Sequence, residues 1–373
     1  MKIAVNIARF LVGVLFVFSG LVKAIDPLGL GYKMQEFFEV WASDGYLTGM
    51  MNYLHAQSTW FSIMMIVLEI VLGIALLLGF RKKLILNLLL LLTLFFTFLT
   101  SYVLFTGKIR ACGCFGDCIP LTPMQTFIKD IILSALIIFL IIYKQYIQPV
   151  FNGVTSVFLI FTCTIAATFL QFYVLKHLPL KDCLPYKKGN NILELRKMPA
   201  GAIADKYDYQ FVYEKDGNKK EFNTSNLPDS TWKFTERKQI LVTKGVNNIP
   251  LINDFSLTDS TGANVTEAIL GQSGEYYLLF LQTLNNGVSR WAESFNELSK
   301  KAALSNRAIY IVTADKEKVN EYFNIQHRYN VAIFTSDATA IKTAARANPT
   351  LFVMKSSVVE QKVSWADFSS VIK

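Results

Sequence analysis

The pattern of apolar and polar positions divides this chain into two unlike halves. Apolar segments of about 20 residues recur in the first half, near 3–25, 60–80, 84–106, 124–146 and 152–175. A helix of that length crosses a bilayer, so we expect five transmembrane helices. After Leu178 charged residues and glycines interrupt short alternating runs, and no further apolar segment of that length occurs. The pattern predicts a membrane half followed by a polar half.

The polar half divides again. Alternating runs flank Asp216-Gly217, which is typical of a β-hairpin, so we expect a small β-rich module at 179–249. Residues 250–373 alternate strand and helix patterns, as in an α/β domain. The expected fold is therefore multi-domain: an α-helical bundle of four spans at 1–150, a fifth span at 151–178, the β-rich module and the α/β domain.

Composition supports a membrane protein whose other partners are not nucleic acids. Of the 373 residues, 52% are hydrophobic, and the mean hydropathy is +0.35. The net charge of +9 is spread over both halves without a dense basic run, which argues against nucleic-acid binding. The first apolar segment is long for a signal peptide, and no A-x-A-like cleavage site follows it. We therefore expect this segment to be retained as a span in the lipid bilayer.

The basic residues of the short connections predict the orientation. Lys2 and Arg9, the run 81–83 and Lys144 fall at one side, and such residues favour the cytoplasmic side. We therefore expect a multi-pass protein of the bacterial inner membrane with a cytoplasmic N-terminus. The segment 110–120 and the C-terminal domain would then be periplasmic, although Lys108 and Arg110 lie on that side too and Asp117 offsets them only in part.

Three of the five cysteines lie in the segment "RACGCFGDCIP", at Cys112, Cys114 and Cys118. Thr122 and Pro123 follow as a good N-cap and first helical residue, so the cysteines lead into a helix N-terminus. That position and the nearby cations favour thiolates, while Asp117 opposes them. Three thiols also supply a second sulfur to resolve a mixed disulfide. The segment predicts thiol–disulfide exchange with these cysteines as catalytic residues.

Other interpretations of the cysteines stay open. The segment could carry a structural disulfide, for which Cys183 is the candidate partner on the same side of the membrane. A metal site with Cys183 as fourth ligand is disfavoured because no paired C-x2-C is present, and we expect no metal. Cys163 lies within the fifth apolar segment, where a thiol packs as a small apolar residue.

Charged residues inside the apolar segments are the next candidates. Glu69 lies in the middle of the second segment, where a carboxylate must be paired, protonated or functional. Arg9 and Lys23 lie on the same stripe of the first helix as Gly13 and Gly20, which permit close approach of a second helix. Either cation could form an interhelical ion pair with Glu69. The alternative is a role for Glu69 and Arg9 in binding a cofactor or relaying protons.

The stretches "RFLVGVLFVFSGLVKAIDPLG", "LEIVLGIALLLGF" and "CGCFGDC" together resemble the DoxX/MauE family of redox-associated membrane proteins. The resemblance covers about residues 1–146. It implies a four-helix bundle with a cysteine loop at its outer surface, and a redox role for Cys112 and Cys114 toward exported proteins. The architecture is also similar to bundles of the vitamin K epoxide reductase type, so a quinone cofactor follows only by analogy of fold.

The C-terminal domain, about 250–373, resembles a thioredoxin-like fold. "ARANPTLFVMK" looks like its cis-proline segment, with Asn348 and Pro349 as candidate partner-binding residues. The turn that carries C-x-x-C in a thioredoxin reads "FLQTLNNGVSRW" here, and no cysteine follows Cys183. We therefore expect a domain that docks a partner and does not itself exchange disulfides.

Two functions follow from these patterns. The first is a membrane thiol–disulfide redox protein, or an accessory of one, that acts on an exported or periplasmic protein. The second is a non-catalytic scaffold of a cell-envelope complex, in which the cysteines form a structural disulfide. A transporter is disfavoured because five spans without internal repeats do not match the usual architecture.

Overall fold

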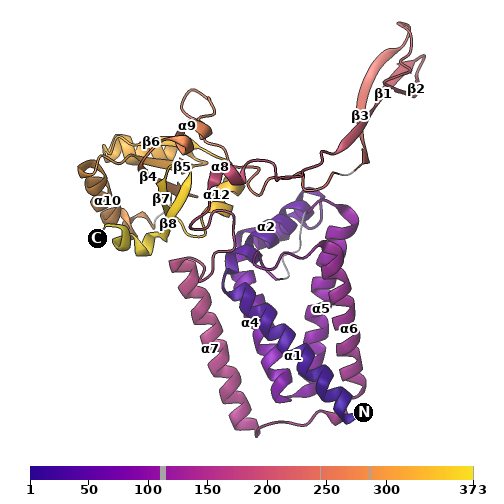
Figure 1. Cartoon of the computed structure of the whole chain (residues 1–373). Helices are drawn as coiled ribbons and strands as arrows, with labels where there is room; N and C mark the ends of the chain where they lie inside the picture. The colour runs from indigo at the N-terminus through magenta and orange to yellow at the C-terminus, as the bar shows by residue number, and fades with distance from the viewer. Residues whose placement is uncertain (110–114, 244, 285–286, 373) are drawn as a thin grey trace.

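The structure is a computed structural model that describes residues 1–109, 115–243, 245–284 and 287–372. A helical bundle, a narrow three-stranded arm and a five-stranded sheet domain follow one another along the chain (Figure 1). The multi-domain architecture expected from the sequence is confirmed at this level.

Within these ranges, five helices are long and apolar enough to cross a membrane, as predicted. They are α1 (Lys2–Ala24), α4 (Ser58–Leu78), α5 (Lys82–Thr106), α6 (Pro123–Ile142) and α7 (Gly153–His177). Helices α1, α4, α5 and α6 form the bundle, and α7 packs mainly against α4 at its side (Figure 1).

Close approach of α1 and α4 depends on the glycines that the sequence singled out. A Cβ atom on Gly13 would lie 2.5 Å from Cγ of Leu77, and one on Gly20 would lie 2.5 Å from Cγ1 of Ile70. Neither distance is sterically allowed, so any larger residue would force the two helices apart. The small residues therefore fix the register between α1 and α4.

The connection between α1 and α4 holds two helices that the apolar-run pattern does not predict, α2 (Pro27–Ser43) and α3 (Thr48–Ala56). The Asp26 carboxylate caps α2 by accepting a hydrogen bond from the Gly29 amide at 3.3 Å. Apolar residues on one face of α2, such as Phe37, are buried against the bundle. We call the end of the bundle on which α2 lies the cysteine end.

Helix α6 begins at the cysteine end with the capping box that the sequence predicts. Thr122 Oγ1 accepts a hydrogen bond from the Gln125 amide at 3.3 Å, and Gln125 Oε1 accepts one from the Thr122 amide at 3.0 Å. The described cysteine of the loop, Cys118, thus lies just before a well-defined helix start.

The arm is an antiparallel sheet of β1 (Lys206–Lys215), β2 (Asn218–Asn223) and β3 (Lys233–Thr243) in the order β2-β1-β3. Asp216 and Gly217 both have positive φ in the turn between β1 and β2, as a tight hairpin turn requires. The hairpin predicted there is present. Figure 1 shows the arm projecting away from the other two regions, and every residue of β3 is exposed.

The sheet domain has five strands in the order β6-β5-β4-β7-β8. Their bounds are β4 (Glu275–Leu281), β5 (Ile309–Thr313), β6 (Ala332–Thr335), β7 (Thr350–Lys355) and β8 (Val358–Ser364). The pairs β4–β5 and β5–β6 are parallel, whereas β4–β7 and β7–β8 are antiparallel. Its helices are α8 (Ile192–Leu195), α9 (Thr266–Gly271), α10 (Ala292–Leu304), α11 (Lys316–Asn320), α12 (Ala338–Ala344) and α13 (Ser369–Ile372). The domain also has the short 3-10 or π segments η2 (Val288–Arg290), η3 (Glu321–Gln326) and η4 (Trp365–Asp367). A further 3-10 segment, η1 (Lys144–Tyr146), lies between α6 and α7.

The central strand β4 is buried on both faces of the sheet, as its unbroken apolar run indicates. Alternate side chains enter two separate cores, represented by Leu278 on one face and Leu279 on the other. Helices cover both faces, which is the α/β arrangement expected for this half of the chain.

The segment after α7 belongs to the sheet domain, although the predicted boundaries assign it to the 179–249 module. Tyr186 and Ile192 are fully buried in the core on one face of the sheet. The Gly189 amide donates a hydrogen bond to the Val359 carbonyl of β8 at 2.7 Å. Tyr186 and Ile192 stand among polar residues, so the pattern along the chain does not predict their burial.

Candidate functional site

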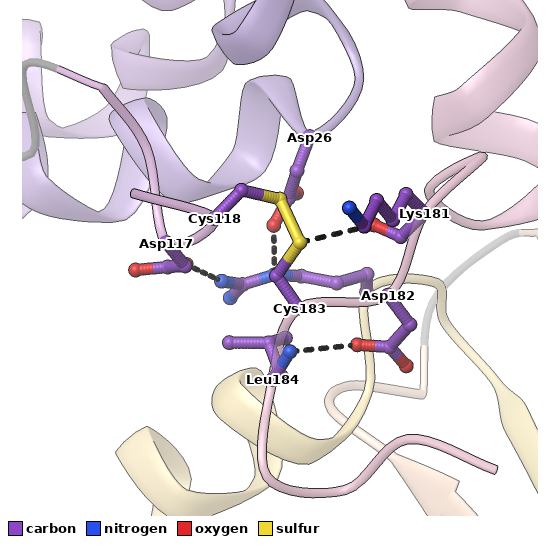
Figure 2. Close-up of a disulfide and its surroundings, with 8 residues drawn as sticks. Asp26, Asp117, Cys118, Lys181, Asp182, Cys183 and Leu184 are labelled. Atoms are coloured by element: carbon purple, nitrogen blue, oxygen red, sulfur yellow. Dashed lines mark hydrogen bonds and ion pairs between the residues drawn. A yellow bond between two sulfur atoms is a disulfide. The ribbon is translucent and has the colours of Figure 1, made fainter. Parts of the chain in front are cut away.

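A disulfide between Cys118 and Cys183 joins the bundle to the sheet domain (Figure 2). Cys118 lies in the turn before α6, and Cys183 follows the end of α7 by six residues. Their Cα atoms are 5.0 Å apart, and both residues are half-buried. The sequence offered Cys183 as a candidate disulfide partner, and the structure pairs it with the last cysteine of the loop.

The other cysteines are not part of this bond. Cys112 and Cys114, the remaining predicted catalytic residues, lie outside the described residues. Cys163 is a free, half-buried thiol within α7. A metal site built on Cys118 and Cys183 would need two thiolates, which a disulfide does not offer.

Arg346, between α12 and β7, makes the main ionic contact beside the disulfide. Its Nε lies 2.8 Å from Oδ2 of Asp26, the capping residue of α2, and its Nη2 lies 2.7 Å from Oδ2 of Asp117. The Arg346 side chain is only 5% exposed, and Nη1 also donates to the Lys342 carbonyl at 3.1 Å. One guanidinium thus joins the sheet domain to two separate segments of the bundle.

Burial and charge act in opposite directions on this cluster. Burial alone would lower the pKa of Arg346, but the carboxylates of Asp26 and Asp117 outweigh it and raise that pKa. Burial raises the pKa of the Asp26 carboxyl, with Arg346 opposing and Asp117 adding to the rise. Arg346 is therefore a permanent cation, and its two partners compensate its charge.

The segment that carries Cys183 is held by a second ion pair. Asp182 Oδ2 lies 2.6 Å from Nζ of Lys362 on β8. Figure 2 shows the second contact of Asp182, whose Oδ1 accepts a hydrogen bond from the Leu184 amide at 3.0 Å. The Lys362 side chain is only 4% exposed, and burial lowers its pKa while Asp182 opposes that change. Neighbours of both disulfide cysteines are therefore anchored on the sheet domain.

Helix α2 also contacts the sheet domain through polar side chains. Lys342 Nζ donates to Gln35 Oε1 at 3.2 Å, and the Tyr32 hydroxyl donates to Gln282 Oε1 at 3.4 Å. The Arg346 guanidinium lies over the Tyr32 ring, 5.2 Å from its centroid. A cleft of about 350 Å³ opens between α2 and α12 beside these contacts.

The predicted partner-binding residues lie on the same edge of the sheet domain. The Asn348–Pro349 peptide bond is cis, Pro349 is buried and Asn348 is half-buried. Asn348 Nδ2 donates to the Thr283 carbonyl at 2.7 Å, and the Gln282 amide donates to Asn348 Oδ1 at 2.9 Å. Asn348 is therefore tied to the segment after β4, where the sequence lacks C-x-x-C.

Arg9, proposed from the sequence as a cofactor-binding or ion-pair residue, lies at the opposite end of the bundle. Its guanidinium donates to the carbonyls of Leu76 at 2.8 Å, Gln148 at 2.9 Å, and Leu77. These carbonyls belong to the last turn of α4 and to the α6–α7 connection. Arg9 thus satisfies backbone acceptors that the end of a helix leaves unpaired, far from Glu69 in the helix.

Glu69 instead pairs with Lys23, the other cation that the sequence offered. Glu69 Oε2 lies 2.5 Å from Lys23 Nζ, and their side chains are 5% and 1% exposed. Nearby, Asp130 Oδ1 lies 2.6 Å from Lys129 Nζ, and Asp130 Oδ2 accepts from Thr100 Oγ1 at 3.2 Å. The bundle interior therefore contains paired carboxylates.

The space beside these ion pairs tests whether a quinone fits. A cavity of about 10 Å³ is lined by residues that include Lys23, Glu69 and Asp130. That volume suits about one water molecule and leaves no room for a quinone ring. The residues present at Glu69 therefore do not form a quinone site, and Arg9 does not line this cavity.

Sequence reasoning missed the residues that connect the two domains. Arg346 stands only three positions before the recognised Pro349, but nothing in its local pattern marks it as buried. Asp26 had a usable signal, since Asp followed by Pro is typical of a helix start. The pairing of Arg346 with Asp26 and Asp117 joins positions more than 200 residues apart, and no short-range pattern reports it.

Fold and site together define a multi-pass membrane protein whose cysteine-bearing bundle is disulfide-linked to a membrane-external α/β domain. Residues 1–143 match the family model described as "Methylamine utilisation protein MauE". The predicted MauE-like membrane protein is thereby confirmed over the bundle. Residues 207–244, which form most of the arm, match a "Domain of unknown function (DUF8463)".

One curated relative is similar to about half of this chain. "Protein TlpB" of Flavobacterium psychrophilum is 32% identical over 186 residues, which are 49% of this chain and 45% of that protein. The match thus spans less than half of the relative's length. No solved structure matches the chain.

Proposed function

We propose that this chain is an integral membrane thiol–disulfide redox protein that acts on exported proteins through Cys112, Cys114 and Cys118. The observation that carries the proposal is the Cys118–Cys183 disulfide at the cysteine end of a MauE-like bundle. Both of its cysteines are half-buried, so the bond is sheltered without being sealed in a core.

A single exchange with the client balances between the client and the chain. A client thiolate attacks the disulfide, giving a mixed disulfide and one cysteine thiolate of the chain. The client's second thiol then displaces the chain's other sulfur. The client gains a disulfide, and two electrons and two protons pass to Cys118 and Cys183. Cys112 and Cys114, close in sequence to Cys118, are the second pair: as a disulfide they re-oxidise Cys118 and Cys183 by the same exchange and become dithiols. A disulfide outside the chain then oxidises them and takes up the two electrons and two protons.

The redox site is proposed to face the periplasm, with the N-terminus in the cytoplasm of a bacterial cell. The opposite end of the bundle carries Lys2, the connection 81–83 and Lys144, as the preference for cytoplasmic basic residues requires. The sheet domain and the cysteine loop lie at the other end, where an oxidising compartment lets disulfides persist.

The sheet domain is proposed to be a thioredoxin-like module that docks a partner at Asn348 and Pro349. Support comes from its mixed five-stranded sheet and from the cis bond before Pro349. The lack of cysteines beyond Cys183 leaves this module a docking function and no exchange chemistry of its own.

A scaffold function is the second candidate, and one observation favours it. The Cys118–Cys183 bond lies beside the Arg346–Asp117 ion pair, which already joins bundle and sheet domain, and the Lys362–Asp182 ion pair, which holds the Cys183 segment on the sheet domain. A disulfide in that position could be purely structural, as in many envelope proteins.

Trapping of the cysteines in cells separates the two functions. Cells are quenched with acid, free thiols are alkylated, and disulfides of the purified chain are mapped by mass spectrometry. The redox function predicts mixed disulfides with exported proteins, and their loss in a Cys112→Ser/Cys114→Ser variant. Cys163→Ser is the matched control and leaves the adducts unchanged. A Cys118–Cys183 bond that is fully formed under all conditions, without adducts, would support the scaffold.

A further inference from the structure

Ion pairs of the residues that precede the two disulfide cysteines hold the cysteine segments close together. On the bundle side, Asp117 precedes Cys118 and is bound to Arg346 at 2.7 Å. On the other side, Asp182 precedes Cys183 and is bound to Lys362 at 2.6 Å. Arg346 and Lys362 both belong to the sheet domain, so that domain holds both cysteine segments at once.

The contact on the Cys183 side is local to the sheet domain. Tyr186 and Ile192 are buried in its core, and the Gly189 amide is bonded to β8. Cys183 therefore stays in place when the disulfide is reduced. Cys118 is different, because its segment belongs to the bundle and reaches the sheet domain through Asp117.

The geometry of Arg346 suits the task of holding that segment. Its Nε bonds Asp26 and its Nη2 bonds Asp117, so the planar guanidinium joins the start of α2 and the cysteine loop in one fixed arrangement. A lysine has a single ammonium on a flexible stem and lacks this fork. The Arg346 side chain is 5% exposed and that of Asp26 15%, so their contact is sheltered from water. The Asp117 side chain is 39% exposed, so water screens its contact with Arg346 more.

We propose that Arg346 is a positioning residue, which keeps Cys118 beside Cys183 in the dithiol state so that their disulfide re-forms within the chain. The proposal rests on the proposed redox function, because it gives the reduced state a role. Proximity of this kind acts as a raised effective concentration of one thiol at the other.

The chemistry of re-oxidation makes this measurable with oxidised glutathione. One cysteine thiolate attacks glutathione disulfide, forming a mixed disulfide and releasing one glutathione thiolate. The second cysteine then displaces the other glutathione and closes the Cys118–Cys183 bond. Two cysteine thiols and one glutathione disulfide give one protein disulfide and two glutathione thiols. The fraction left as mixed disulfide reports how close the second thiol stays.

The experiment uses the full chain in detergent with Cys112, Cys114 and Cys163 replaced by serine, reduced by a phosphine that is then removed. Redox buffers of defined glutathione ratio are added, and the products are acid-trapped and quantified by mass spectrometry. Arg346→Gln is expected to lower the ratio of intramolecular to mixed disulfide at least tenfold. Arg346→Lys is expected to fall between this variant and the unsubstituted Arg346.

Lys342→Gln is the matched control, because Lys342 contacts α2 from the same helix region without reaching Asp117. It is expected to change the ratio less than twofold. Asp117→Asn tests the same link from the bundle side and is expected to reproduce much of the Arg346→Gln effect. Helix content and thermal midpoint of each variant show that it is folded.

The outcomes separate this inference from the proposed function. An unchanged ratio in folded Arg346→Gln and Asp117→Asn overturns the positioning role, whatever the cell trapping shows. A tenfold fall supports it, even if no client adducts are found in cells, in which case the redox function fails and Arg346 serves to form a structural bond.

Discussion

Two buried arginines hold opposite ends of this membrane protein, and they differ in what they bind. Arg9 is 8% exposed and donates to backbone carbonyls, all within the membrane half. Arg346 is 5% exposed and binds the carboxylates of Asp26 and Asp117 across two domains. The partners of Arg9 are backbone carbonyls, whereas Asp117 is a side chain adjacent to Cys118, which forms the disulfide with Cys183.

The difference suggests which end is rigid and which is adaptable. Arg9 completes the C-terminal turn of α4 and secures the connection to α7, so its loss damages the fold itself. Arg346 connects two bodies that each have their own core. Its loss should change how these bodies meet while each of them stays folded.

Replacing Arg9 gives the largest expected effect. Arg9→Met leaves the carbonyls of Leu77 and Gln148 without the Arg9 donor, while the Leu76 carbonyl keeps the Gly79 amide. Each unsatisfied buried acceptor costs roughly 1–3 kcal/mol. We expect the free energy of unfolding of the bundle to fall by about 4 kcal/mol, measured by thermal or denaturant unfolding in detergent. Arg346→Met is the paired variant and should leave the transition of the bundle within about 1 kcal/mol of its original value. Equal losses of unfolding free energy in the two variants would contradict the distinction between Arg9, which stabilises the bundle, and Arg346, which joins two domains.

The Lys23–Glu69 pair tests whether the interior of the bundle behaves like the Arg9 end. Lys23→Met leaves the Glu69 carboxylate without its cation, and breaking a buried pair in this way costs about 3 kcal/mol. The double variant Lys23→Met/Glu69→Leu removes both charges and should recover most of that loss, as unfolding of both variants in detergent would measure.

The same two variants address the proposed proton or cofactor role of Glu69. If the pair is structural, the stable double variant should exchange disulfides at the original rate in the cell-trapping assay. Loss of client adducts in a stably folded double variant would instead show that the charges themselves take part in the reaction.

The sequence made the membrane architecture predictable, because spans, helix caps and close-packed glycines are local signals. The capping residues of α6 and the glycines of α1 each act on neighbours within a few turns or on one adjacent helix. The junction was not predictable in the same way. Arg346, Asp26 and Asp117 are ordinary polar residues until the fold buries them together, and α2 lacked the length of a span.

The candidate redox site was predictable in part. Clustering of Cys112, Cys114 and Cys118 predicts thiol–disulfide exchange, and Cys183 was a candidate disulfide partner because it lies on the expected side of the membrane. The choice of Cys118 as its partner depends on where the turn before α6 meets the segment after α7. Spacing along the chain does not contain that information.

Tyr186 sharpens the comparison by offering a buried polar group of the opposite kind, and its replacement gives the smallest expected effect. Unlike both arginines, its hydroxyl has no hydrogen-bond partner among the described residues, and burial raises its pKa. Tyr186→Phe should therefore leave the stability of the sheet domain unchanged or raise it by up to about 1 kcal/mol.

Tyr276→Phe is the matched control, because the Tyr276 hydroxyl donates to the Ser356 carbonyl at 2.8 Å and its loss should cost about 1 kcal/mol. Hydrogen exchange of the β4 amides in the full chain measures both effects. A loss of sheet-domain stability in Tyr186→Phe as large as that in Tyr276→Phe would mean that the Tyr186 hydroxyl makes a hydrogen bond after all.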